Sequence, residues 1–162
     1  LSAGLQHPAT HQHHVYWRFD FDIGSAGNNL PLEYTPGEGT NWGYGPGWRP
    51  MLGEEAFPFA NRSWAVLNKQ TNIGYLINRG PNDGDGGSFA PWEGAAVVYH
   101  ANEDMRGGMG TAVDDGLYQL ATGEIVDGAD VVIWYVAHLH HHYPGPEFDW
   151  HVCGPLLWPI RY

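Results

Sequence analysis

The sequence predicts an all-β protein, an antiparallel β-sandwich of about eight short strands joined by long loops rich in glycine, proline and aromatic residues. Three observations support this prediction. Apolar and polar residues alternate with the two-residue period of strands, and the 23 glycines and 12 prolines interrupt the chain at short intervals. No long stretch is rich in the residues that favour helices. Because no linker or internal repeat is visible, we expect a single domain over residues 1–162.

The first expected strand covers residues 11–23, after a lead-in without periodicity, and ends at the turn-rich segment 24–29. Strand alternation divides it into two faces. One face carries His11, His13, Val15, Trp17, Phe19, Phe21 and Ile23, and the other carries Gln12, His14, Tyr16, Arg18, Asp20 and Asp22. Two imidazoles two positions apart on a rigid strand can bind one metal ion. The two carboxylates, with the same spacing, suit a hard cation such as calcium.

A short strand is expected at residues 30–34, followed by a long loop over residues 36–58. This loop contains three aromatic residues among glycines, Trp42, Tyr44 and Trp48. They either form a stacking surface for a carbohydrate or another small molecule, or fold back and pack on the sandwich. The sequence leaves both interpretations open.

The second half of the chain begins with an expected hairpin, residues 63–68 and 72–78, joined by a polar turn. Residues 82–87 resemble a calcium-binding loop, but they lack the flanking helices and the closing glutamate of an EF-hand, which favours a flexible turn. Further strands are expected at 95–100, 117–120 and 130–137. The last is apolar on both faces, as a buried central strand should be, and it leads into His138, His140, His141 and His142.

Charge and composition restrict the partners. The net charge is −11 and the only lysine is Lys69, so nucleic acid and anionic membranes would be repelled. No apolar run reaches the length of about 18 residues that a membrane span requires. Low lysine with abundant Trp, Tyr, Gly and Asn is typical of secreted proteins, so we expect an extracellular protein whose chain opens at Leu1 as a mature form. Cys153 is the only cysteine, so an intrachain disulfide is excluded. Three interpretations remain for it: a small buried apolar side chain, a thiol that is free or linked to another chain, or a soft metal ligand.

The two histidine clusters together predict a metal site. Each follows or begins an apolar strand, and three imidazoles from two strands would form a copper or zinc site. We expect it to use His11, His13 and one histidine of the second cluster. Ligand softness and geometry do not separate copper from zinc here.

Four segments, in this order, resemble copper amine oxidases. His11-Gln12-His13 followed by residues 18–22 (Arg-Phe-Asp-Phe-Asp) resembles the stretch of that family with two copper ligands and a calcium-binding strand. Residues 62–68 with 74–76 resemble its next hairpin, and residues 127–135 resemble its penultimate strand. Residues 144–150 (Pro-Gly-Pro-Glu-Phe-Asp-Trp) resemble the segment after its third copper histidine. From His11 to about Arg161, the chain is therefore similar to the C-terminal part of the copper amine oxidase catalytic domain.

This resemblance implies two metal sites. Copper would be bound by His11, His13 and a third histidine, which is His141 when counted from Trp134 and His142 when counted back from Trp150. The calcium site of the family would correspond to the carboxylates of Asp20, Asp22 and Asp130, with the backbone oxygens of Phe21 and Val131. One departure is that residues 150–154 read Trp-His-Val-Cys-Gly, where the family has Trp-Pro-(Val/Ile)-Met-Pro.

The resemblance does not supply the amine-oxidising machinery. The quinone of the family forms from a tyrosine upstream of His-x-His, with a catalytic aspartate further upstream, and none of the ten residues before His11 is Tyr or Asp. We therefore assign no catalytic or quinone residue, and whether the protein is an enzyme stays open. The favoured function is a secreted copper-binding and calcium-binding module that self-associates and has a structural, assembly or metal-holding role. The alternatives are a copper-dependent oxidase or monooxygenase that uses the three-histidine centre directly, and a structural protein whose histidines bind nothing essential.

Overall fold

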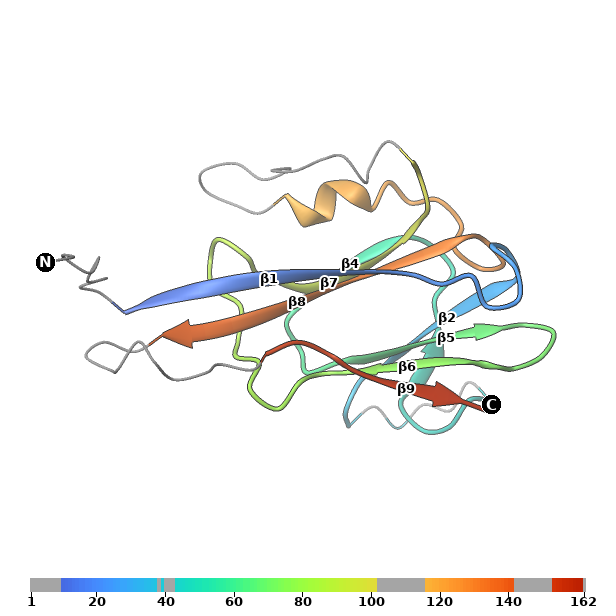
Figure 1. Ribbon diagram of the computed structural model, residues 1–162, viewed down its shortest axis with the longest axis horizontal. Coiled ribbons are helices and arrows are strands. Elements are labelled where there is room, and N and C mark those ends of the chain that lie inside the picture. Colours follow the sequence, from blue (N-terminus) through green and yellow to red (C-terminus); the bar gives the residue numbers. More distant parts are fainter. Residues whose placement is uncertain (1–9, 38, 40–42, 102–115, 142–152, 162) are drawn as a thin grey trace, which may run out of the picture.

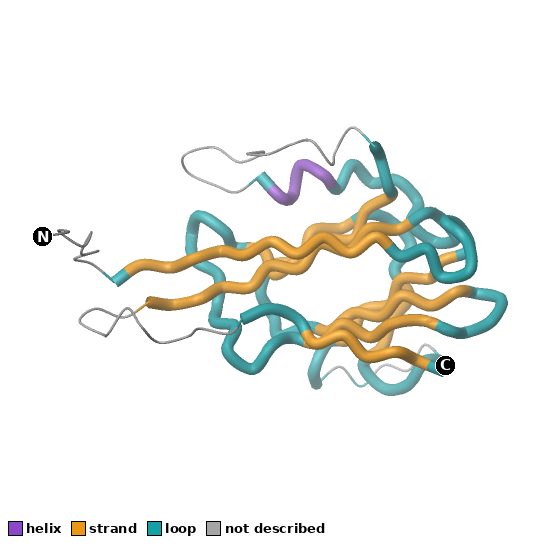
Figure 2. The backbone as a smooth tube through the Cα atoms, in the orientation of Figure 1, coloured by secondary structure: helices purple, strands orange, loops and turns teal. Residues whose placement is uncertain are grey.

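The computed structural model describes residues 10–37, 39, 43–101, 116–141 and 153–161, which form two antiparallel sheets facing each other (Figures 1 and 2). The order of the first sheet is β1 (His11–Asp20), β8 (Val131–His141), β7 (Trp92–Val98) and β4 (Glu55–Pro58). The order of the second is β3 (Trp48–Pro50), β2 (Asn29–Tyr34), β5 (Ser63–Asn68), β6 (Gly74–Asn78) and β9 (Leu156–Ile160). The β-sandwich prediction is confirmed.

Strand β8 is the central element of the first sheet, between β1 and β7, as its apolar sequence predicts. On its inner face, Ile133, Tyr135 and Ala137 pack with Trp64 of the second sheet in the main core. The other residues of this core include Phe57, Val66 and Ile77. The outer face of β8 is covered by the 3-10 helix η1 (Leu117–Leu120), whose two leucines pack on Val132 and Val136. The strand continues to His141, further than residue 137.

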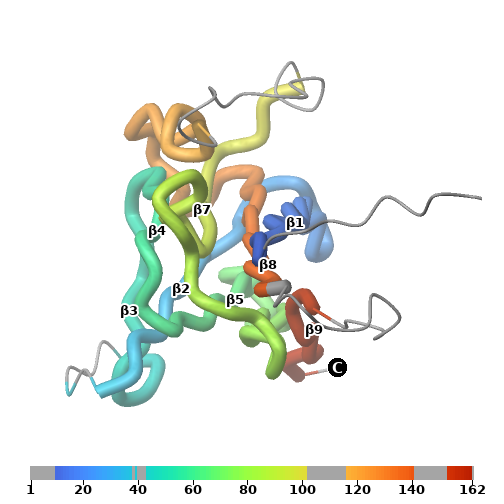
Figure 3. The backbone as a smooth tube through the Cα atoms, turned by 90° about the vertical axis from the view of Figure 1, so that its left-hand side faces the viewer, coloured from blue at the N-terminus to red at the C-terminus, as the bar shows by residue number. Residues whose placement is uncertain are grey.

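Strand β1 is an edge strand, so its apolar face is only partly covered. Viewed from the end of the sandwich, β1 and β9 are the edges on the same side of the molecule (Figure 3). Trp17 is 42% exposed and Val15 is 37% exposed, whereas Phe21 and Ile23 enter the core. The strand ends at Asp20, before the expected residue 23. Phe21 and Ile23 therefore belong to the segment that follows the strand, and this segment carries them into the core.

Two expectations about secondary structure are wrong, and one strand was not anticipated. Residues 117–120 form a 3-10 helix because Leu117 and Leu120, three positions apart, both face the sheet, and three residues make one 3-10 turn. The expected loop 36–58 contains the short edge strands β3 and β4. Strand β9 was not anticipated from the sequence; it contains Pro159, which is compatible with an edge strand such as this one.

Two further segments agree with their expected form. The hairpin expected at 63–68 and 72–78 is confirmed as β5 and β6, with β6 beginning at Gly74. The strand expected at 95–100 is β7, which begins earlier, at Trp92, and ends at Val98. Among the described residues, no helix has the length and apolar character needed to cross a membrane.

Candidate metal centre

His11 and His13 lie at the start of β1, on the face that is turned toward the second sheet. The register of β1 and β8 shows this. Trp17 is opposite the inward-facing Tyr135, and positions 11 and 13 lie an even number of residues before Trp17, so they share its face. The two rings are edge to face, with centroids 4.7 Å apart, and their Nε2 atoms are 3.0 Å apart. The structure thus brings these two predicted ligands together at one end of the sandwich.

The separation of the two nitrogens is compatible with binding to one ion. Two imidazole nitrogens, each about 2.0 Å from a tetrahedral ion, would be about 3.3 Å apart. A hydrogen bond between the two rings also gives a separation of 3.0 Å. The distance therefore shows that the two nitrogens point toward each other, and it does not show a bound ion. His13 is exposed and His11 is half-buried, so an ion bound here would be near solvent.

The third copper ligand is restricted by the register. Position 141, the last of β8, is paired with His11 in the antiparallel ladder. His142 lies outside the described residues. The choice between His141 and His142 therefore stays a prediction.

The three predicted calcium carboxylates are adjacent in space. The oxygens of Asp20, Asp22 and Asp130 lie within 4.8 Å of one another. Asp130 Oδ1 is buried and accepts no hydrogen bond from any described residue. Burial, and then the charges of Asp20 and Asp22, raise the pKa of the Asp130 carboxyl. An ionised carboxylate in this position is unfavourable unless a cation accompanies it.

The surroundings of these carboxylates leave room for a cation. Arg18 Nη1 is 3.3 Å from Asp20 Oδ2 and offsets part of the negative charge. The Phe21 carbonyl accepts one hydrogen bond from Asn29 Nδ2, at 3.1 Å, and retains a second lone pair. Asn29 Nδ2 is also 3.2 Å from the carbonyl oxygen of Ala129, which joins the end of β1 to the start of β8. An open groove of about 390 Å³ borders Asp20 and Asp22.

The structure brings together a third group that the sequence did not indicate, Glu54, His100 and Glu124. Their ligand atoms lie within 4.8 Å of one another, and His100 Nε2 is 2.9 Å from Glu124 Oε1. Glu54 already accepts hydrogen bonds from four backbone N–H groups and the Thr122 hydroxyl. Its carboxylate therefore caps the segment 122–124 without any ion. The three residues are far apart in sequence and share no motif, so only the fold identifies them.

The remaining candidate residues have mixed outcomes. Trp48 packs on Tyr34, with ring centroids 5.3 Å apart, whereas Tyr44 is exposed and Trp42 lies outside the described residues. The carbohydrate or small-molecule interpretation stays a prediction. Cys153 is a partly buried free thiol packed against the core, and burial, with the charge of Asp83, raises the pKa of its thiol.

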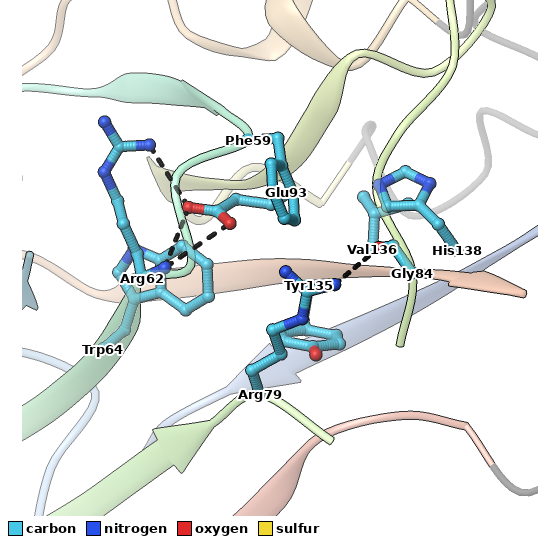
Figure 4. A pocket seen from close by; sticks show the side chains of 9 residues that line it. All are labelled: Phe59, Arg62, Trp64, Arg79, Gly84, Glu93, Tyr135, Val136 and His138. Carbon is cyan, nitrogen blue, oxygen red and sulfur yellow. Dashed lines mark hydrogen bonds and ion pairs between the residues drawn. The ribbon is translucent and has the colours of Figure 1, made fainter. Parts of the chain in front are cut away.

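A small pocket beside β7 and β8 has too little space for a ligand. Figure 4 shows it between Arg62, Glu93, Arg79, Tyr135 and His138. Its volume is about 10 Å³, which is space for about one water molecule. The buried indole Nε1 of Trp64, which lines it, donates to no described residue.

Comparisons with known proteins identify other structures with this two-sheet fold. No family model matches the sequence, and no curated protein matches it. Solved structures do match. A copper-containing benzylamine oxidase from Hansenula polymorpha has 17% identity and a TM-score of 0.59, and the match covers 93% of this chain and 28% of the other. In its fold, this chain is an amine-oxidase-like β-domain.

Two other structures give the same result. The Aspergillus nidulans amine oxidase has 17% identity and a TM-score of 0.58, with 82% of this chain and 23% of the other covered. The Pichia pastoris lysyl oxidase PPLO has 18% identity, a TM-score of 0.54 and the same coverage values of 82% and 23%. The amine-oxidase-like domain thus spans about a quarter of the length of these structures. At such identities the likeness concerns the fold alone.

Proposed function

We propose that this amine-oxidase-like domain is an extracellular metal-binding module that corresponds to the C-terminal part of the copper amine oxidase catalytic domain. In this proposal, copper is held by His11, His13 and a histidine at the end of β8. The observation that carries the proposal is the 3.0 Å approach of the Nε2 atoms of His11 and His13 on the inward face, with position 141 opposite position 11. The fold likeness supports copper over zinc, because the matched benzylamine oxidase is described as copper-containing.

Calcium is the second metal of the proposal. The ligands would be Asp20, Asp22 and Asp130, with the carbonyl oxygens of Phe21 and Val131. The buried oxygen of Asp130 without a described donor, next to two further carboxylates, supports a hard cation at this position. Because this site joins the end of β1 to the start of β8, calcium would stabilise the two strands that present the copper histidines.

The role of the module is structural, assembly-related or metal-holding, and it includes self-association. One observation favours the alternative of a copper-dependent oxidase or monooxygenase: His13 is exposed, so dioxygen or peroxide would reach a copper ion bound beside it. Copper would supply redox chemistry there, and His11 and His13 would hold and orient it. Oxygen consumption or peroxide-driven turnover by the copper-loaded protein distinguishes this alternative from the metal-holding role.

The test of the proposal is copper binding. Titration with Cu(II) should give one equivalent bound to the native sequence and none to the His11→Ala, His13→Ala double variant, while the circular dichroism spectrum is unchanged. His14→Ala is the matched control and should affect binding much less, because strand alternation places His14 on the opposite face. Unchanged stoichiometry in the double variant would refute the site. Anomalous scattering at the copper and zinc edges, measured on crystals, would identify the metal and its third ligand.

A further inference from the structure

The outward face of β1 and β8 carries a second set of polar side chains, directly behind the inward-facing histidines. We call it the backing layer and define it as Gln12, His14, His138 and His140. The strand register pairs Gln12 with His140 and His14 with His138. Gln12 Nε2 is 3.0 Å from His140 Nε2, and the Nδ1 atoms of His14 and His138 are 2.8 Å apart. Each pair therefore adds a side-chain contact to the backbone ladder at the end that presents His11 and His13.

The hydrogen bonds of His138 fix its ring. His138 is 1% exposed, and its Nε2 is 3.1 Å from the Trp92 carbonyl oxygen. Because a carbonyl oxygen only accepts, Nε2 carries the proton and Nδ1 accepts from His14 Nδ1. Phe89 stacks on the His14 ring, with centroids 5.8 Å apart. The His14–His138 pair is thus held between β7 and the loop that precedes it.

The loop of residues 83–87 (Asp-Gly-Asp-Gly-Gly) lies directly on the backing layer. The Gly84 N–H donates to the His138 carbonyl oxygen at 2.6 Å. Gln12 Nε2 donates to the Asp85 carbonyl oxygen, which is also 3.1 Å from His140 Nε2. Arg79 supports the loop through a 2.6 Å hydrogen bond to the Gly84 carbonyl oxygen, beside His138 (Figure 4).

Gly84 is required by its contact with the backing layer, and Gly86 by its contact with the backbone of Ala90. A Cβ at Gly84 would be 2.3 Å from His140 Cδ2 and 2.9 Å from the His138 carbonyl oxygen. At Gly86 it would be 2.4 Å from the Ala90 carbonyl oxygen and 3.2 Å from His138 Nε2, and at Gly87 it would be 2.9 Å from Gln12 Oε1, at the end of a side chain that can move. The resemblance to a calcium loop thus has another explanation, because glycine is needed where a backbone approaches imidazole rings closely.

We propose that the backing layer and the loop 83–87 position the copper ligands. This inference rests on the proposed function, and it assigns Gln12, His138 and Gly84 as positioning residues that do not touch the metal. Positions 11 and 141 form the last pair of the β1–β8 ladder, where a strand pair opens most readily. A slip of one residue would move His11 and His13 to the opposite face. Contacts behind the ladder oppose both events, so their loss should weaken metal binding through the position of the strands.

The experiment compares two positioning variants with a matched glycine control. Gln12→Glu keeps the side-chain shape but replaces the donor to the Asp85 carbonyl with an acceptor. Gly84→Ala introduces the Cβ clash with His140, whereas Gly39→Ala is the control because no other described residue lies within 4 Å of a Cβ added there. Three quantities are measured: the Kd for Cu(II), the electron paramagnetic resonance spectrum of bound Cu(II), and amide hydrogen exchange of residues 11–14 and 17–20 in the metal-free protein.

The expected result is a selective loss of order at the end of the ladder. Both variants should weaken Cu(II) binding about threefold to tenfold, the equivalent of one lost hydrogen bond, alter the hyperfine splitting, and speed exchange at residues 11–14 but not at residues 17–20. Gly39→Ala should match the native protein in all three. If Kd and the copper spectrum do not change in Gln12→Glu, which is at a partly exposed position and should fold, the inference is wrong, whatever the exchange data show. If the native protein binds no copper, the proposed function fails, and the exchange at residues 11–14 alone then supports or refutes the stabilising role of the layer.

Discussion

Tyr135 donates its phenolic hydrogen to the carboxylate of Asp83 in the interior of the protein. Asp83 also accepts from the backbone N–H groups of Gly80, at 3.2 Å, and Gly154, at 2.8 Å. One carboxylate therefore connects β8, the segment after β6 and the segment before β9. Burial, and then the hydrogen bond to Asp83, raise the pKa of Tyr135, so the phenol stays neutral and keeps donating.

Tyr135→Phe should lower the free energy of unfolding by about 1–3 kcal/mol, because a buried carboxylate loses one of its donors. Urea denaturation at neutral pH measures this. The control is Tyr118→Phe, since Tyr118 is 45% exposed, and its effect should stay within about 0.5 kcal/mol. Equal effects of the two substitutions would show that the Tyr135 hydroxyl does not stabilise the fold.

Calcium should raise the melting temperature, and a chelator should lower it, because the carboxylates of Asp20, Asp22 and Asp130 repel one another without a cation. Asp130→Ala should remove this response. Asp127→Ala is the matched control, since Asp127 pairs with Lys69 at 2.7 Å and is not one of the three carboxylates of the predicted calcium site. Repeating the melts with the His11→Ala, His13→Ala variant excludes an effect of copper loss. A native melt that does not respond to the chelator contradicts the calcium site.

Glu54 should account for part of the loss of stability in acid. Burial alone would raise its pKa, but hydrogen bonds from the Val98 N–H and from Thr122 outweigh burial and hold the pKa below its usual value. A carboxylate with a lowered pKa in the folded state stabilises the protein above its unfolded pKa of about 4.3. This stabilisation is lost as the pH falls through the folded pKa.

Glu54→Gln should therefore reduce stability at pH 7 and flatten its decline in acid, as measured by urea midpoints at a series of pH values. Glu55→Gln is the control, because Glu55 is an exposed residue that pairs with Arg49 at 3.2 Å. A decline in acid as steep in Glu54→Gln as in the native protein would show that another group is responsible.

The third copper ligand should be His141, because the register pairs its position with His11. His141→Ala should weaken Cu(II) binding far more than His142→Ala, and it should remove one imidazole nitrogen from the copper spectrum. Competition titration with a chromogenic chelator measures both affinities. If His142→Ala weakens Cu(II) binding more than His141→Ala, the third ligand is His142, as counting back from Trp150 suggests.

The 162-residue polypeptide should not oxidise amines by itself. Aerobic copper loading should produce no quinone absorption, and benzylamine should release no peroxide. That chemistry requires an electrophilic carbonyl and a base near the substrate. Tyr16, the first tyrosine after the histidine pair, is on the other face of β1. A positive redox-cycling stain, with the modified tyrosine located by mass spectrometry, would reverse this conclusion.

Local periodicity in the sequence was sufficient to predict that the protein is all-β. The alternation in β1, the apolar run of β8 and the polar turn between β5 and β6 each act within one segment, so a sequence pattern is enough to identify them. The spacing of His11 and His13, and of Asp20 and Asp22, is likewise a property of a single strand. The resemblance to copper amine oxidases added the more distant Asp130, which the structure places beside the other two carboxylates.

Tertiary structure decided what no local pattern contains. The short edge strands β3, β4 and β9 exist because neighbouring strands pair with them, since their own sequences of three to five residues carry little signal. Residues 117–120 form a 3-10 helix because this conformation lets both Leu117 and Leu120 pack on the outer face of the first sheet. The contacts of the loop 83–87 with His138 and His140 likewise follow only from the fold. In each case, contacts between segments far apart in the chain outweigh local preference, because the sheet order determines which segments meet.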